Sequence, residues 1–181
     1  ALFGTSSALM MTLDVALGAC VSEGEKMGQE ERIQNAYRGL GGKRTFYDGM
    51  ITCSTLSGRA VCRLVWGTGR AETQDYLSTA LAGIPEGFSG RLLEVTVGTG
   101  ILTMPLYREM PEAEITCLDY SPEMLEWAKS RGEGLAHVCF QQGDVGALPF
   151  GDGSFDIVLS LNGFHAFPDK EAAWREVVRV L

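Results

Sequence analysis

Residues 91–100, RLLEVTVGTG, contain the clearest sequence signal for the architecture of the chain. Its first part is rich in leucine, valine and threonine, and two glycines separated by one residue, Gly98 and Gly100, follow at once. Glycine lets the backbone turn tightly and approach another group closely. The pattern predicts a strand that ends in a tight turn. It leaves open whether a phosphate, another backbone or a cofactor without phosphates lies at that turn.

Strands and helices alternate from residue 90 onward. Ser121 is the expected N-cap of one of the helices, with Pro122 at its first position, and Asp169 is the expected N-cap of the last helix. Strands are predicted at 91–97, 114–120, 137–142 and 155–162, and helices at 101–110, 121–131 and 170–181. Apolar strands that alternate with helices predict a doubly wound α/β domain, with a mostly parallel sheet covered on both faces.

Two segments precede this domain. We expect residues 1–45 to form an N-terminal extension, helical or partly ordered, and residues 46–89 to form a helical lid or cap over the α/β domain of residues 90–181. The first twenty residues are apolar, but Asp14 interrupts them and no lysine or arginine precedes them. This pattern favours a docking helix or a loose tail over a membrane span or a signal sequence.

Composition narrows the classes of function. The chain has 181 residues and a net charge of −8, and no basic stripe offsets the excess of acids, which argues against non-specific nucleic-acid binding. The five cysteines show neither a C-x-x-C pair nor a Cys/His metal spacing. We therefore expect no metal, and the odd number of cysteines fits reduced thiols in a cytoplasmic protein.

Suitable polar groups follow four successive strands. In parallel sheets, ligands bind beyond the carboxyl ends of the strands, where Gly98, Asp119, Asp144 and Asn162 are predicted to lie. A single such residue is more often a turn glycine or a solvated acid, but four together are a stronger signal. Asp119 comes nineteen residues after Gly100, the position at which a carboxylate can accept hydrogen bonds from both hydroxyls of a ribose. The sequence predicts a nucleoside site.

Two nucleoside cofactors compete for this site. A dinucleotide turn of the form G-x-G-x-x-G would need glycine at position 103 or, in the other frame, at 96 and 101, but these positions hold Thr103, Thr96 and Ile101. The acid Glu94, inside the strand, would lie awkwardly near a pyrophosphate and suits a positively charged group. A dehydrogenase is therefore disfavoured.

Four stretches of the chain together resemble the class I S-adenosylmethionine-dependent methyltransferases, and most closely the small-molecule branch that includes the quinone-biosynthesis C-methyltransferases. They are LLEVTVGTGILTMPL, ITCLDYSPEMLEWAK, QQGDVGALPFGDGSFDIVLSLNGFHAFPD and AAWREVVRVL, and they extend over residues 91–181. The resemblance implies a Rossmann-like sheet of seven strands, of which only four can be counted before Leu181. It also implies an acid followed by three alternating glycines, and here Thr96 replaces the first of them.

The resemblance implies a role for each matching position. Gly98 and Gly100 would let the loop run close to the methionine part of S-adenosylmethionine. Glu94 would help to hold the ammonium group of that part. Asp119 would accept hydrogen bonds from the ribose hydroxyls. Tyr120 and Met124 would line the adenine pocket, although ordinary core packing is the alternative role for both. Asp144 would accept the adenine amino group beside a backbone contact from Val145. The remaining implied cofactor-binding positions are Tyr47, which would close over the cofactor, Thr96, Leu161 and Asn162.

The implied activity is methyl transfer to a small-molecule acceptor, with S-adenosylhomocysteine as the product. His165 could act as a base, or it could simply start a helix, so the catalytic residue stays unassigned. Cys117 and Cys139 would face each other on adjacent strands as core thiols if the strand order of the family holds. A non-catalytic module that binds S-adenosylmethionine is the alternative function, and a nucleotide-dependent dehydrogenase is a weaker one.

Overall fold

The computed structural model describes residues 48, 49, 51, 52, 54–61, 63, 75, 78–161 and 163–181. Before the sheet lies the short helix α4 (Leu56–Val61). The strands are β1 (Arg91–Val95), β2 (Glu114–Asp119), β3 (Val138–Gln142) and β4 (Ile157–Leu159). Further elements are the helices α6 (Met104–Arg108), α7 (Pro122–Arg131) and α8 (Lys170–Val180) and the 3-10 turn η2 (Phe164–Ala166).

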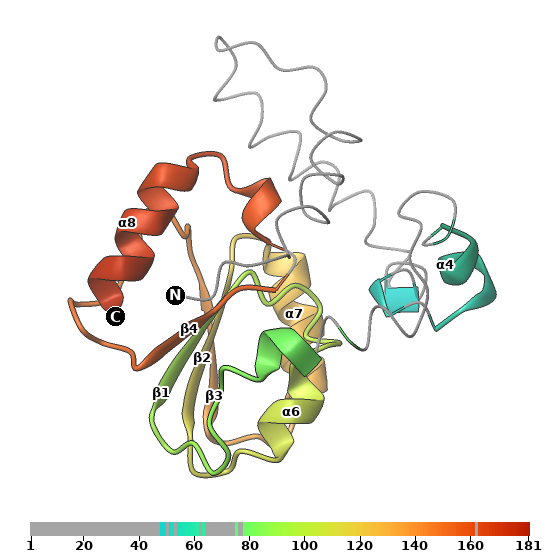
Figure 1. Cartoon of the computed structure of the whole chain (residues 1–181), viewed down its shortest axis with the longest axis horizontal. Helices are drawn as coiled ribbons and strands as arrows, with labels where there is room; N and C mark the ends of the chain where they lie inside the picture. The colour runs from blue at the N-terminus through green and yellow to red at the C-terminus, as the bar shows by residue number, and fades with distance from the viewer. Residues whose placement is uncertain are drawn as a thin grey trace, which may run out of the picture.

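The four strands form one parallel sheet in the order β3-β2-β1-β4. Helices α6 and α7 cover one face of this sheet and α8 covers the other (Figure 1). The chain therefore winds in both directions from β1, which confirms the predicted doubly wound α/β fold. All four strands end at the same edge of the sheet, so that the segments following them meet there.

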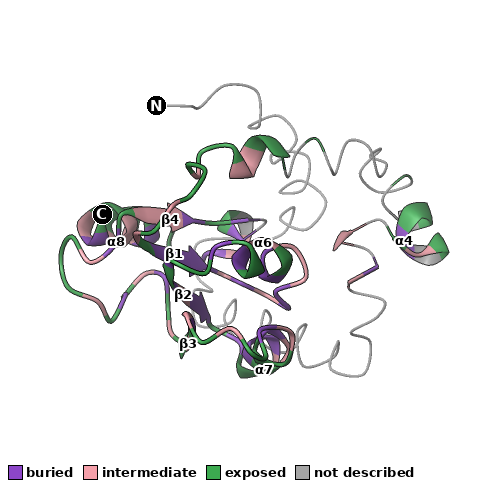
Figure 2. Ribbon diagram, turned by 90° about the horizontal axis from the view of Figure 1, so that it is seen from below, coloured by how far each residue is buried: buried purple, intermediate pink, exposed green. Residues whose placement is uncertain are grey.

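Two apolar clusters hold the layers together. One cluster packs α6 and α7 against the sheet around Leu92, Tyr107 and Leu125. The other packs α8 and the loop before β4 against the opposite face around Leu93, Phe155 and Val180. Figure 2 shows buried residues along β1 and β2, between the two helical layers. Because both faces of these strands are covered, they read as nearly continuous apolar runs.

Local signals explain where the helices begin. Ser121 accepts a hydrogen bond from the Met124 N–H at 3.3 Å, and Asp169 accepts one from the Ala172 N–H at 2.9 Å, so both predicted N-caps are confirmed. Helix α6 begins at Met104 instead of at residue 101 as predicted. The reason is Pro105, which fits only the first turn of a helix because its ring would clash with an earlier turn.

The strands are shorter than predicted, for identifiable reasons. Strand β1 ends at Val95, because Thr96 has a φ of 63°, which no strand residue adopts. Strand β4 begins at Ile157, because the N–H of Phe155 donates to the carbonyl of Val180 at 2.9 Å and not to a neighbouring strand.

The prediction that Cys117 and Cys139 face each other is wrong. The register of β2 and β3 pairs Cys139 with Thr116 and pairs Cys117 with Phe140. Since successive residues of a strand point to opposite faces, the two thiols lie on opposite sides of the sheet. Cys117 is buried against α6, whereas Cys139 is exposed.

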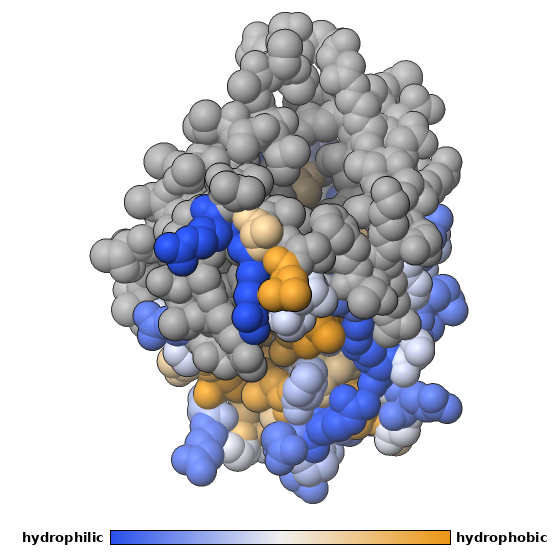
Figure 3. All heavy atoms as spheres, turned by 90° about the vertical axis from the view of Figure 1, so that its right-hand side faces the viewer, coloured by the Kyte–Doolittle hydropathy of each residue, from blue (hydrophilic) through white to orange (hydrophobic). Residues whose placement is uncertain are grey.

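The outer surface on the side of α6 and α7 carries hydrophilic side chains around a group of apolar ones (Figure 3). Arg108, Glu126 and Lys129 are exposed on these helices, and Lys129 pairs with Glu126 at 2.8 Å. In the space-filling view of that side, hydrophilic side chains frame the lower part of the described surface (Figure 3). Polar outer faces and apolar inner faces are the pattern of helices that cover a sheet.

Candidate cofactor site at the carboxyl ends of the strands

A pocket opens where β2, β3 and the segment after β4 come together at the carboxyl edge of the sheet. It has a volume of about 60 Å³. Its lining residues are Thr96, Leu118, Tyr120, Gly143, Asp144, Val145, Phe167 and Pro168. Four of these, Thr96, Tyr120, Asp144 and Val145, are among the predicted cofactor-binding residues. The lining is mostly apolar, with a few polar groups, which is the common composition of small-molecule sites.

Asp119 joins the end of β2 to the glycine turn. One carboxylate oxygen accepts a hydrogen bond from the Gly98 N–H at 2.8 Å, and the other accepts one from the Ser121 N–H at 2.9 Å. The side chain is buried, and burial raises the pKa of Asp119 above its usual range, although the backbone donors favour the charged form. Each oxygen can accept a further hydrogen bond, so the carboxylate can still receive a ligand hydroxyl.

The glycine turn has a backbone that favours glycine. Gly98 and Gly100 have φ values of 58° and 68°, in the left-handed region. A Cβ on Gly100 would also lie 2.9 Å from the side chain of Met104, so that position has no room for one. The predicted tight turn after the first strand is therefore present, and it lies next to the carboxylate of Asp119.

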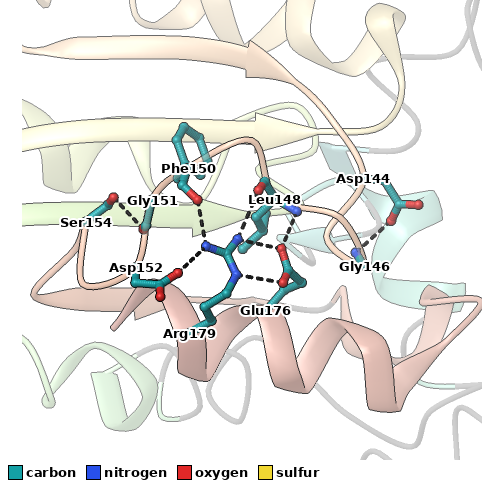
Figure 4. A network of polar contacts seen from close by, with 9 residues as sticks. All are labelled: Asp144, Gly146, Leu148, Phe150, Gly151, Asp152, Ser154, Glu176 and Arg179. Carbon is teal, nitrogen blue, oxygen red and sulfur yellow. Dashed lines mark hydrogen bonds and ion pairs between the residues drawn. The ribbon is translucent and has the colours of Figure 1, made fainter.

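The loop after β3 carries Asp144 and Val145 and is held by α8. Arg179 donates hydrogen bonds to the carbonyls of Phe150 and Leu148 at 2.7 and 3.1 Å, and Glu176 accepts one from the Leu148 N–H at 2.8 Å (Figure 4). Asp144 itself accepts a hydrogen bond from the Gly146 N–H at 2.8 Å. This network fixes the loop, so that the exposed Asp144 and the buried Val145 both line the pocket.

Glu94 lies beneath α6 and not in the lining of the pocket. It is 2% exposed, and its Oε2 accepts hydrogen bonds from the Tyr107 hydroxyl at 2.8 Å and from the Cys117 thiol at 3.8 Å. Burial raises the pKa of Glu94 to about 7, and the Tyr107 hydroxyl limits the rise. Burial likewise raises the pKa of Tyr107 and of Cys117 well above their usual ranges. Contact between Glu94 and the cofactor ammonium stays a prediction.

Asp48 ties the segment before the sheet to the glycine turn. Its carboxylate accepts a hydrogen bond from the Thr99 hydroxyl at 2.7 Å and forms an ion pair with Arg131 at the end of α7. Arg131 also donates to the carbonyl of Thr99 at 2.5 Å. The side chains of Asp48 and Arg131 are only 14% and 18% exposed, so this clamp is well shielded from water.

The remaining predicted residues lie in other places. Met124 and Leu161 are buried and do not line the pocket, and Leu161 belongs to the cluster under α6. The backbone of His165 lies in η2. Tyr47 and Asn162 lie outside the described residues.

Some site residues were not predicted from the sequence. Leu118, Gly143, Phe167 and Pro168 also line the pocket, and Thr99 and Arg131 complete the clamp on Asp48. Phe167 and Pro168 follow the fourth strand closely, so the rule about strand ends could have included them. Arg131 is 83 residues from Asp48, and no local pattern links two such positions.

Within the described ranges, no group of three or more metal-ligating side chains comes together. None of the described helices combines the length and the apolar character needed to cross a membrane.

Comparison with known proteins places this geometry in a family. The sequence pattern of the family described as Methyltransferase domain matches residues 92–181, which contain the four strands, the glycine turn and the pocket. The demethylmenaquinone methyltransferase of Thermus thermophilus is 41% identical over 92 residues, which make up 50% of this chain and 42% of that protein. Residues 92–181 are a class I methyltransferase domain.

Two solved structures share the fold of this methyltransferase domain. The YcgJ protein of Bacillus subtilis matches with a TM-score of 0.54 and 33% identity over 60% of this chain and 46% of that one. The (4+2)-cyclase SpnF matches with a TM-score of 0.53 and 27% identity over 64% of this chain and 42% of that one. The chain spans less than half the length of these curated relatives, the demethylmenaquinone methyltransferases of Thermus thermophilus and Deinococcus radiodurans.

Proposed function

We propose that the protein binds S-adenosylmethionine and transfers its methyl group to a small-molecule acceptor, leaving S-adenosylhomocysteine. The observation that carries the proposal is the buried carboxylate of Asp119, which is bonded to the Gly98 N–H next to a pocket lined by Tyr120 and Asp144. The fold of the methyltransferase domain and its relatives support it. A fold alone hosts many functions, so the residues of the site must carry the proposal.

The residues present fit the nucleoside part of this cofactor. Asp119 has free lone pairs for ribose hydroxyls, and the ring of Tyr120, 38% exposed, lines the pocket where adenine would lie. Asp144 would accept the adenine amino group, and Val145 would add a backbone contact. Gly98 and Gly100 would pass the methionine part, with Glu94 behind them. Tyr47, Met124, Leu161 and Asn162 remain proposed members of the site.

When bound, S-adenosylmethionine supplies a methyl carbon that is already electrophilic, so the protein has to align an acceptor and exclude water. The strand-end residues hold the nucleoside, and the clamp of Asp48 on Thr99 and Arg131 keeps the glycine turn in place. A base is needed only if the acceptor atom must lose a proton. His165 remains a candidate for that role.

We propose that residues 46–89 form a cap on the methyltransferase domain. Asp48 supports this, because it joins that segment to the glycine turn through two partners. A cap that closes over a bound cofactor would exclude water and complete the acceptor site.

The acceptor is proposed to be a small molecule and not a nucleic acid, because a net charge of −8 disfavours binding to a phosphate backbone. A quinol-like ring is the first acceptor to test, since the relative from Thermus thermophilus is named as a methyltransferase of demethylmenaquinone. We also propose a cytoplasmic location, which the odd number of cysteines in the sequence supports.

The alternative function is a module that uses the same pocket without transferring a methyl group. The similarity to SpnF, a cyclase by its name, shows only that this fold also occurs in a protein that is not named as a methyltransferase. A dehydrogenase is a weaker candidate, because Thr103 occupies the place of the third glycine of a dinucleotide turn and is fully buried.

The test is transfer of label from methyl-labelled S-adenosylmethionine to a panel of quinol-like and other small acceptors. The proposal expects label in one acceptor together with an equal amount of S-adenosylhomocysteine. If the protein binds the cofactor and no acceptor gains label, the non-catalytic module is supported instead. If NAD binds and neither adenosyl compound does, the proposed function is wrong.

A further inference from the structure

Thr96 has a backbone conformation that threonine rarely adopts. Its φ is 63°, and it is the one non-glycine residue with a positive φ among those the structure describes. The left-handed region is sterically poor for a β-branched side chain, whereas glycine adopts it without penalty. The chain therefore keeps a side chain at a position where the backbone itself favours glycine.

The side chain of Thr96 occupies the space that a side chain on Gly163 would need. Its hydroxyl donates to the carbonyl of Val95 at 2.5 Å, and a Cβ built on Gly163 would lie only 1.7 Å from the same oxygen. Such a Cβ would also approach the Cβ of Thr96 to 2.7 Å. The end of β1 and the segment after β4 thus have room for one side chain between them, and Thr96 supplies it.

Thr96 also borders the candidate cofactor site. It lines the pocket together with Tyr120 and Asp144, and it precedes the Gly98–Gly100 turn by two residues. Since Thr96 lines the pocket and lies so close in the chain to the turn, we expect a ligand that extends from the pocket to the turn to contact its side chain. A ligand confined to the pocket does not have to pass it.

We propose that Thr96 is a specificity-determining residue, which narrows the passage between the pocket and the glycine turn. It lowers the affinity for a complete S-adenosyl compound relative to the bare nucleoside adenosine, and Gly163 is the compensating residue that makes room for it. This inference rests on the proposed function, since it takes the ligand to be an adenosyl compound.

The experiment measures binding of S-adenosylhomocysteine and adenosine by calorimetry to the full chain and to Thr96→Gly. We expect the variant to bind S-adenosylhomocysteine roughly tenfold more tightly, a change of about 1.4 kcal/mol, and adenosine within about twofold of the parent chain. A ratio of the two affinities that stays within twofold would overturn the inference. Failure of both chains to bind either compound would overturn the proposed function and this inference with it.

A second pair of variants tests the shared space. Gly163→Ala should lower the melting temperature when Thr96 is present, because the new Cβ overlaps its hydroxyl. The same change should have little effect, or raise the melting temperature, in the Thr96→Gly background, where the space is empty. Coupling between contacting positions makes such effects non-additive. Additive shifts would contradict the assigned role of Gly163. The Thr96→Gly, Gly163→Ala double variant should also bind S-adenosylhomocysteine more tightly than the parent chain. This result would show that the gain in affinity comes from the wider passage and not from a general loosening of the loop.

Discussion

The hydroxyl of Tyr107 donates a hydrogen bond to the carboxylate of Glu94 at 2.8 Å, and both side chains are sealed from solvent beneath α6. Ionising a buried carboxylate that has one strong neutral donor costs free energy, because desolvation disfavours the charged form. This explains why the pKa of Glu94 is raised to about 7 from an ordinary value of 4.5. The pair links the stability of the domain to pH.

The first prediction is a fall in stability with rising pH. Between pH 4.5 and 7 the unfolded chain releases the proton of Glu94 while the folded chain keeps it. The free energy of unfolding therefore decreases across that window by about 3 kcal/mol from this group. The raised pKa of Asp119 acts in the same direction. Urea unfolding of the parent chain and of Glu94→Gln at pH 5 and pH 8 measures the effect.

Glu94→Gln should remove most of this pH dependence and should be more stable than the parent chain at pH 8. Glu112→Gln changes an exposed glutamate and serves as the control, with the pH dependence of the parent chain. Tyr107→Phe should shift the loss of stability to higher pH, because the hydroxyl that favours charged Glu94 is gone. Equal pH dependence in Glu94→Gln and the parent chain would show that Glu94 is not the group responsible.

The second prediction concerns Asp119. Replacing it with alanine removes the acceptor proposed for two ribose hydroxyls, at a cost of roughly 1.5–3 kcal/mol of binding for each charge-assisted bond. It also removes the partner of the Gly98 and Ser121 N–H groups, so the melting temperature should fall as well. Asp119→Asn keeps one acceptor oxygen and should therefore lose less cofactor affinity and less thermal stability than Asp119→Ala. An alanine variant that folds and binds S-adenosylhomocysteine like the parent chain would move the site elsewhere.

Regular patterns made much of the fold predictable. The alternation of strands and helices after residue 90, the Ser121 and Asp169 caps and the Gly98–Gly100 turn are local signals, and the structure contains each of them. The rule that ligands bind at strand ends predicted Asp144, and the family resemblance added Tyr120 and Val145; all three line the pocket. The pattern overestimated strand and helix lengths, since Thr96 and Pro105 end or delay elements inside apolar runs.

Contacts between distant parts of the chain were not predictable. The clamp joins Asp48 to Arg131, and Glu94 finds its partner Tyr107 on α6, because the sheet order brings these elements together. The strand register likewise places Cys117 and Cys139 on opposite faces, contrary to the expectation that they would face each other. Such pairings depend on tertiary structure, so they have no signature in a window of neighbouring residues.

The third prediction tests the clamp on the glycine turn. Arg131→Met removes the guanidinium that pairs with the carboxylate of Asp48 in a shielded place, which should destabilise the domain by about 1–3 kcal/mol. Backbone exchange should increase around Thr99 and around residue 48, the two segments that Arg131 joins. Lys129→Met, on the same helix but in an exposed pair with Glu126, is the matched control and should change little. Identical exchange in both variants would mean that the clamp does not hold the turn.

The fourth prediction concerns the proposed cap. If the segment closes over the cofactor, hydrogen exchange over residues 46–66 should slow on addition of S-adenosylhomocysteine, because closure buries its backbone. Residues 170–180, in α8 on the other face of the sheet, provide an internal control that should change little. Exchange over 46–66 that is the same with and without ligand would leave this segment a structural element and weaken the proposal of an enzyme with a lid.

Calorimetric titration of the full chain with S-adenosylhomocysteine and, separately, with NAD shows which of the two cofactor classes the site at the strand ends binds. Dissociation in the micromolar range or tighter, on the order of −8 kcal/mol, is expected for S-adenosylhomocysteine, with no measurable heat from NAD. Binding of NAD without binding of S-adenosylhomocysteine would contradict the account.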